Sequence, residues 1–136
     1  MIMKIVGFGI KRLLGEKNKI DTTGLKLNQN INIKDVYKEK LDIAGEEVIN
    51  LNFIFSVEYS DDYGKISIEG NVFILPEKDE SKEFIKSLKE KSIPERFKTP
   101  IFNFIMGKCN IKALSLEDEL NLPLHVPMPR LRPKED

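Results

Sequence analysis

The first half of the chain contains long rows in which apolar and polar residues alternate. In the first row, apolar residues fall on odd positions from Leu25 to Ile43, except at the polar Gln29 and at the acidic Asp35 and Glu39, which interrupt the row. A period of two over this length predicts a half-buried strand, or two strands in line, with one face toward solvent. Because the acidic residues break the apolar row, we expect a bend or a β-bulge near Asp35 to Tyr37.

Two further rows have the same period. Apolar residues occupy the odd positions from Ile49 to Tyr59 and then the even positions from Ile66 to Ile74. Each row predicts one strand, and the first of the two is the clearest strand in the chain. Gly70 interrupts the second row, where it leaves room for a bulge or for a close neighbour.

Short polar connections join these rows. Ala44-Gly45-Glu46 and the segment 60–64 carry turn residues, and Gly64 is suited to a positive φ angle. Connections this short predict a meander of three antiparallel strands. The N-terminal segment 2–14 alternates more weakly and predicts a fourth strand, and the polar stretch 15–24 predicts a crossover between that strand and the meander.

The pattern then changes to a helical period. Phe84, Ile85 and Leu88 lie on one face of a short amphipathic helix, and Lys and Glu residues cover the remainder of its surface. Either Asp79 or Ser81 can cap the N-terminus of this helix.

A second, more apolar helix is predicted from Pro100 to about Leu114, with Thr99 as its N-cap. Its polar stripe consists of Asn103, Gly107 and Asn110. Apolar side chains occupy the rest of the circumference, so this helix needs cover on more than one side. We expect the sheet on one side and the C-terminal segment or a second subunit on another. A capping-box pattern at 115–118 predicts one further turn.

Prolines and apolar residues alternate in the C-terminal segment from Leu122 to Met128. Prolines at 123, 127 and 129 are incompatible with a helix and hinder strand pairing. We therefore predict an extended strap that lies over the second helix or the sheet. A partner-binding or disordered tail is the alternative interpretation.

Length and composition are consistent with one α+β domain. The chain has 136 residues, of which 40% are hydrophobic and 32% are charged. We predict a single domain over residues 1–129 and a mobile tail over 130–136. The domain consists of a four-stranded antiparallel sheet, followed by a short and a long helix packed on one face and by an extended proline-rich C-terminal strap.

Charge and sequence signals argue against several classes of protein. Lys plus Arg and Asp plus Glu both total 22, so the net charge is zero and no strong field would attract nucleic acid or anionic lipid. The chain contains no apolar run long enough for membrane insertion. The short apolar N-terminus carries Lys4 and is not followed by a cleavage site, and Cys109 is a lone cysteine. Both observations favour a cytoplasmic location.

The residues that could carry chemistry are few. His125 is the only histidine, and we expect a partly exposed ring without a metal or catalytic role. Cys109 is expected to be a small core residue, and the carboxylates at 46–47, 61–62 and 117–119 are expected to be solvated. No enzyme, metal site or cofactor is predicted. An enzyme or small-molecule site would need a polar pocket that includes Asn103 and Asn110.

The order of these elements resembles the SecB export chaperone family. In that family a four-stranded antiparallel sheet is followed by a long helix and by a motif of the kind QLNLAPVNF. The comparable stretch here runs from Glu119 to Pro127 and reads ELNLPLHVP. The C-terminal pattern also resembles the LPLPxP ending of a small archaeal family to which no activity is attached. The SecB resemblance implies a homo-oligomer, a dimer or tetramer, that holds unfolded polypeptide in apolar grooves between sheet and helices.

Two functions are consistent with these patterns. The first is the binding of unfolded or apolar polypeptide segments by a SecB-like holdase chaperone. The second is a non-catalytic structural or regulatory subunit that docks on one specific protein partner. For the first function, the candidate binding residues are Phe53, Phe55, Ile101, Phe102, Ile105, Leu122, Leu124, Val126 and Met128. An ordinary role in the core is the alternative for the five residues of the sheet and helix.

Overall fold

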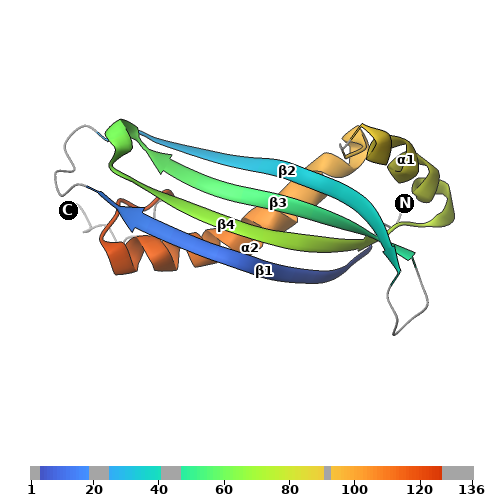
Figure 1. Ribbon diagram of the computed structural model, residues 1–136, viewed down its shortest axis with the longest axis horizontal. Coiled ribbons are helices and arrows are strands. Elements are labelled where there is room, and N and C mark those ends of the chain that lie inside the picture. The colour runs from blue at the N-terminus through green and yellow to red at the C-terminus, as the bar shows by residue number, and fades with distance from the viewer. Residues whose placement is uncertain (1–3, 19–24, 41–46, 91–92, 127–136) are drawn as a thin grey trace, which may run out of the picture.

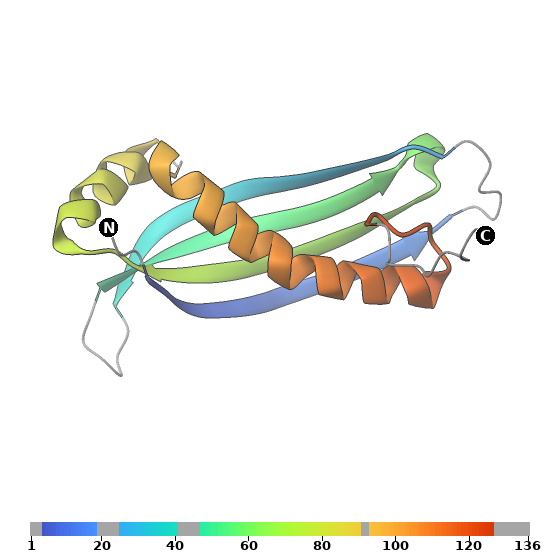
Figure 2. The same cartoon turned by 180° about the vertical axis from the view of Figure 1, so that it is seen from behind.

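A long helix crosses one face of a four-stranded antiparallel sheet in the computed structural model (Figures 1 and 2), which describes residues 4–18, 25–40, 47–90 and 93–126. The elements are β1 (Lys4–Lys17), β2 (Leu27–Lys40), β3 (Glu47–Tyr59), the 3-10 turn η1 (Ser60–Asp62), β4 (Gly64–Leu75), α1 (Lys78–Lys89) and α2 (Glu95–Leu120). The predicted α+β class, with a short helix before a long one, is confirmed.

The order of strands in the sheet is β1-β4-β3-β2. Strands β2, β3 and β4 form the expected meander, and β1 pairs antiparallel with β4 at the far side. The connection between β1 and β2 therefore carries the chain from one edge of the sheet to the other, as predicted. Both β1 and β2 are edge strands in the single chain.

The expected bulge in the first alternating row is present. The register between β2 and β3 shifts between Ile33 and Asp35. Before the shift Ile33 pairs with Phe53, and after it Val36 pairs with Leu51. The inward-facing positions of β2 thus change from odd to even numbers, which explains why the acidic residues interrupt the apolar row.

The core lies between α2 and the sheet. One side of α2 buries every fourth residue, namely Phe97, Ile101, Ile105, Cys109 and Ala113. These side chains pack against the inner faces of β3 and β4, where Leu51, Phe53, Phe55, Val57, Ile66, Ile68, Val72 and Ile74 are buried. This spacing gives α2 a single buried row.

The predicted boundaries of the second helix are wrong. It begins at Glu95 rather than near Pro100, and it continues without a break to Leu120. Pro100 removes one backbone hydrogen bond near the start of the helix. Burial of Phe97 offsets this loss, and the centroid of its ring lies 4.9 Å from that of Phe84, on which it stacks. The helix ends at Asn121, which has a left-handed φ of 55°.

The turn between β3 and β4 also differs from the prediction. Positive φ angles occur at Asp61 and Asp62, both at 56°, and not at Gly64. A side chain at Gly64 would collide with the backbone carbonyl oxygen of Glu16. Glycine is needed at position 64 because β1 and β4 approach closely there. The residues with left-handed backbone angles, Asp61 and Asp62, lie inside η1 instead.

The outer side of α2 is open in the single chain. Phe104 packs edge-on against Phe8 of β1, with ring centroids 5.7 Å apart, whereas Ile111 is 69% exposed. The strap lies beside the C-terminal half of α2, and α1 lies toward the opposite end of the sheet (Figure 2). Cover of the Ile111 side by a second subunit stays a prediction.

Candidate functional site

A groove lies between the edge strand β2 and the middle of α2. Its walls are Gln29, Asn30 and Ile31 of β2 and Phe102 and Met106 of α2, and its volume is about 380 Å³. The groove exists because α2 crosses the sheet diagonally and packs on β1, β3 and β4, so the inner face of β2 is incompletely covered (Figure 2).

The sequence places apolar side chains on both walls of this groove. Ile31 and Ile33 follow the period of two along β2 and are partly buried. Phe102 and Met106 are four residues apart on α2, each next to a fully buried neighbour in the core row. They form a second row on α2, turned toward β2, that the sheet does not fully cover.

Beyond α2 the strap turns back along the inner face of the sheet (Figure 2). Its first residue, Leu122, is buried, and the backbone N–H of Leu122 donates to the Glu117 carbonyl oxygen at 2.8 Å. The carbonyl oxygen of Pro123 accepts a hydrogen bond from the Tyr59 hydroxyl of β3. The predicted strap is therefore confirmed over the described residues 122–126.

A buried polar cluster joins the strap to α2. Nδ1 of His125 lies 2.8 Å from Oε1 and 3.0 Å from Oε2 of Glu117, and both side chains have no exposed surface. The backbone N–H of His125 donates to Oε1 at 3.2 Å, and the Tyr59 hydroxyl donates to Oε2 at 2.9 Å. The Glu117 carboxylate is thus surrounded by hydrogen-bond donors, as burial of a charge requires.

The cluster continues to the groove. Nε2 of His125 lies 2.9 Å from Oδ1 of Asn110, and the amide of Gln29 donates to the same oxygen at 3.4 Å. Gln29 also lines the groove. A chain of hydrogen bonds therefore connects the strap, α2 and the wall of the groove.

Two expectations about this cluster are wrong. The prediction gives His125 a partly exposed ring and Glu117 a solvated carboxylate, yet the two side chains lie against each other with no exposed surface. A signal for Glu117 was present in the sequence. It falls on the buried row of α2, four residues after Ala113 and eight after Cys109, so its side chain had to face the core.

Burial, together with the adjacent Glu117 carboxylate, raises the pKa of the Tyr59 hydroxyl well above its usual range. The hydroxyl therefore keeps its proton at neutral pH and remains a donor. One proton serves two acceptors here, the Glu117 carboxylate and the Pro123 carbonyl. Tyr59 thus connects β3 to both the helix and the strap.

The structure distributes the predicted binding residues among several environments. Phe53, Phe55, Ile101 and Ile105 have no exposed surface and belong to the core. Phe102 lines the groove, and Leu122, Leu124 and Val126 lie on the strap. Leu124 is 40% exposed. Met128 and the predicted tail 130–136 lie outside the described residues.

Comparisons with known proteins bear on this arrangement. No family model and no curated protein sequence matches the chain. A solved structure of the Mycobacterium tuberculosis Rv1957 SecB-like chaperone, in complex with a ChAD peptide from the Rv1956 HigA1 antitoxin, matches with a TM-score of 0.56. The match covers 97% of this chain and 93% of that chain, with 13% sequence identity. The chain has the fold of a SecB-like chaperone.

This match confirms the resemblance read from the order of elements. At 13% identity it establishes a likeness of fold between the two chains. In this chain, the groove and the strap are formed by the residues named above.

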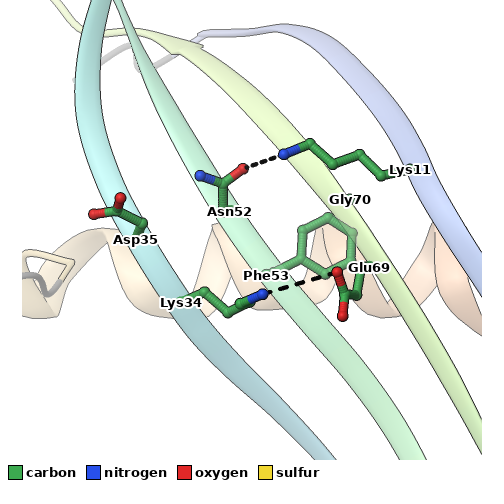
Figure 3. Close-up of a pocket in the computed structure, with 7 residues that line it drawn as sticks. All are labelled: Lys11, Lys34, Asp35, Asn52, Phe53, Glu69 and Gly70. Carbon is green, nitrogen blue, oxygen red and sulfur yellow. Dashed lines mark hydrogen bonds and ion pairs between the residues drawn. The ribbon is translucent and has the colours of Figure 1, made fainter.

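The outer face of the SecB-like fold carries a second polar cluster (Figure 3). Lys11 of β1 and Lys34 of β2 lie at register shifts on opposite edges of the sheet and flank a cavity of about 290 Å³. The Lys11 ammonium donates to Oδ1 of Asn52 at 3.3 Å, and that of Lys34 lies 3.8 Å from Glu69. Each lysine therefore reaches across one intervening strand to a polar partner.

Cys109 lies in the core, as predicted. Burial raises the pKa of its thiol to about 12, so the thiol stays protonated at neutral pH. The described residues contain no group of side chains suited to hold a metal ion. Among the helices of the described chain, none is long and apolar enough to cross a membrane.

Labelling of Cys109 offers a direct check of this core. We expect a maleimide reagent at pH 8 to modify the folded protein at least about 100-fold more slowly than the same protein in denaturant. Mass spectrometry over time measures both rates, with a small-molecule thiol as the control for reagent activity. Equal rates in the two conditions would contradict burial of Cys109.

Proposed function

We propose that the chain binds extended, apolar segments of other polypeptides in the groove between β2 and α2, as a SecB-like holdase. The observation that carries this proposal is the row formed by Ile31, Phe102 and Met106, which the chain's own sheet, helix and strap cover incompletely. The fold match supports it, because the matching SecB-like chaperone was solved with a peptide bound.

The chemistry of the groove suits an unfolded segment. Burial of apolar surface contributes about 25 cal/mol per Å² without a directional requirement, so many sequences can bind. Met106 has a flexible thioether side chain that adapts to different neighbours. β2 is an edge strand, and an extended segment beside it could pair with its free backbone groups.

A charge placed in the groove tests this function. We expect Met106→Asp to weaken binding of a fluorescent, extended apolar peptide by at least about tenfold, because the carboxylate would have to be desolvated. Fluorescence anisotropy measures the affinity, and suppression of aggregation of an unfolded client provides a second readout.

Asn103→Asp is the matched control. It introduces the same carboxylate on the same helix, at an exposed position outside the groove. We expect its peptide affinity to equal that of the wild type. Failure of the wild-type chain to bind apolar peptides or to suppress aggregation would exclude the holdase function.

A specific partner is the second candidate. It is favoured by the neighbour's complex, which contains a peptide from one antitoxin. A panel of unrelated apolar peptides separates the two functions, since a holdase should bind them with similar affinities. A subunit for one partner should prefer a single sequence by about 100-fold or more.

The assembly state and location form part of the same proposal. A homo-oligomer, either a dimer or a tetramer, would bury apolar side chains such as Ile111 on the outer side of α2. A cytoplasmic location would give the groove access to newly made chains. Light scattering of the purified protein measures the oligomer number.

A further inference from the structure

The strap covers a surface that is continuous with the groove. Ile31, in the wall of the groove, pairs across β2 and β3 with Phe55. The ring of His125 packs edge-on against Phe55, with centroids 5.9 Å apart. Two residues toward the start of β2, Gln29 pairs with Val57, which is also buried on the inner face of β3. Removing the strap would therefore extend the groove along β3.

The outer part of the strap is held mainly by polar contacts. Leu122 is its buried apolar anchor, whereas Leu124 is 40% exposed and Val126 is half-buried. Beyond Leu122, the Tyr59 hydroxyl holds the Pro123 carbonyl, and the Glu117 carboxylate holds the ring and the amide of His125. Such contacts are directional, so changing one group can release residues 123–126 while Leu122 stays in place.

The ring of His125 is oriented by two side chains of one helix. Glu117 and Asn110 both belong to α2 and contact opposite nitrogens of the ring, while Phe55 packs against its edge. Tyr59 of β3 and Gln29 of β2 complete the polar surroundings through their hydrogen bonds to these two side chains. The closed position of the strap is therefore defined by the three elements packed around His125.

We propose that the strap is a lid on the polypeptide-binding groove and that the Glu117–His125 pair is its latch. With the latch closed, the groove ends at Gln29 and accepts a short apolar segment. With the latch open, the inner face of β3 around Phe55 becomes accessible and a longer segment binds. The effect on binding rests on the proposed function of the groove, whereas docking of the strap does not.

Hydrogen exchange tests the latch without any ligand. The amides of Leu122 and His125 both donate to Glu117, the first to its backbone and the second to its side chain. In His125→Ala we expect the amides of residues 124–126 to exchange at least about tenfold faster, with the core of α2 unchanged. Leu124→Ala, at an exposed position of the same strap, should leave these rates as in the wild type.

Peptides of two lengths test the lid. A peptide of about six residues spans roughly 20 Å when extended, and one of about twelve residues spans twice that length. We expect His125→Ala to bind the longer peptide at least about fivefold more tightly than the wild type does, with unchanged affinity for the shorter one. Asn110→Ala, which removes the other contact of the ring, should produce a smaller change in the same direction.

The possible failures are distinguishable. Unchanged exchange in His125→Ala would overturn the latch. Faster exchange with unchanged affinity for the longer peptide would overturn the role of the strap as a lid while leaving the short-peptide groove intact. If neither peptide binds either protein, the proposed function fails and the lid role fails with it, and the exchange rates still report whether the strap is latched.

Discussion

Replacement of Glu117 with alanine is expected to lower the free energy of unfolding by about 3 to 5 kcal/mol. The carboxylate has no exposed surface and accepts hydrogen bonds from the His125 ring, the His125 amide and the Tyr59 hydroxyl. Its removal leaves buried donors without a partner, and each such group costs about 1–3 kcal/mol. Urea denaturation followed by circular dichroism measures the change.

Two further variants separate the effect of the charge from that of the side chain and provide a control at an exposed position. Glu117→Gln keeps the shape and one acceptor oxygen but removes the charge, so we expect a loss about half as large. Asp118→Ala alters the next residue, which is exposed, and should change stability by no more than about 0.5 kcal/mol. A loss below about 1 kcal/mol for Glu117→Ala would show that the buried cluster does not hold the fold together.

The strands were predictable because their signal is local. Alternation from Ile49 to Tyr59 identified β3, and the acidic interruption at Asp35 located the register shift to within a few residues. A period of two is visible in the sequence wherever one face of a strand is buried. The order of elements followed from the short connections and carried the resemblance to the SecB-like fold.

The ends of α2 depend on packing, and this limited the prediction. The sequence signal at Thr99-Pro100 is typical of a helix start, yet the helix begins five residues earlier. The extra turn is stabilised by contact between Phe97 and Phe84, which belong to different helices. No local pattern records such a contact, because it depends on how the two helices meet at the end of the sheet.

The site was predictable only in part. Phe102 was among the predicted residues, but Ile31 and Met106 were not, because the walls of the groove depend on the angle at which α2 crosses the sheet. Helical periodicity separates the apolar rows of α2 without showing which of them the sheet covers. Contact between Glu117 and His125 likewise requires the strap to fold back, a tertiary event with no periodic signal.

Gly70 is the position where an added methyl group is expected to be most damaging among the described glycines of the sheet. A side chain there would collide with the carbonyl oxygen of Gly9 on β1 and approach the Phe53 ring to 2.9 Å. The first obstacle is backbone and cannot rotate away, and the second is a fully buried ring. Gly70→Ala is therefore expected to lower the free energy of unfolding by about 3 kcal/mol, as measured by thermal and urea denaturation.

Gly9→Ala is the matched control for this effect. A side chain at Gly9 would meet no atom within 4 Å, although Gly9 lies on the strand next to Gly70. Alanine also restricts the unfolded chain, so this variant should be neutral or more stable by up to about 1 kcal/mol. If both variants lost equal stability, a general intolerance of the β1–β4 pair to side chains would replace the specific explanation. A large loss for Gly70→Ala alone would mean that the close approach of the Gly9 carbonyl oxygen and the Phe53 ring leaves no room for a side chain at this position.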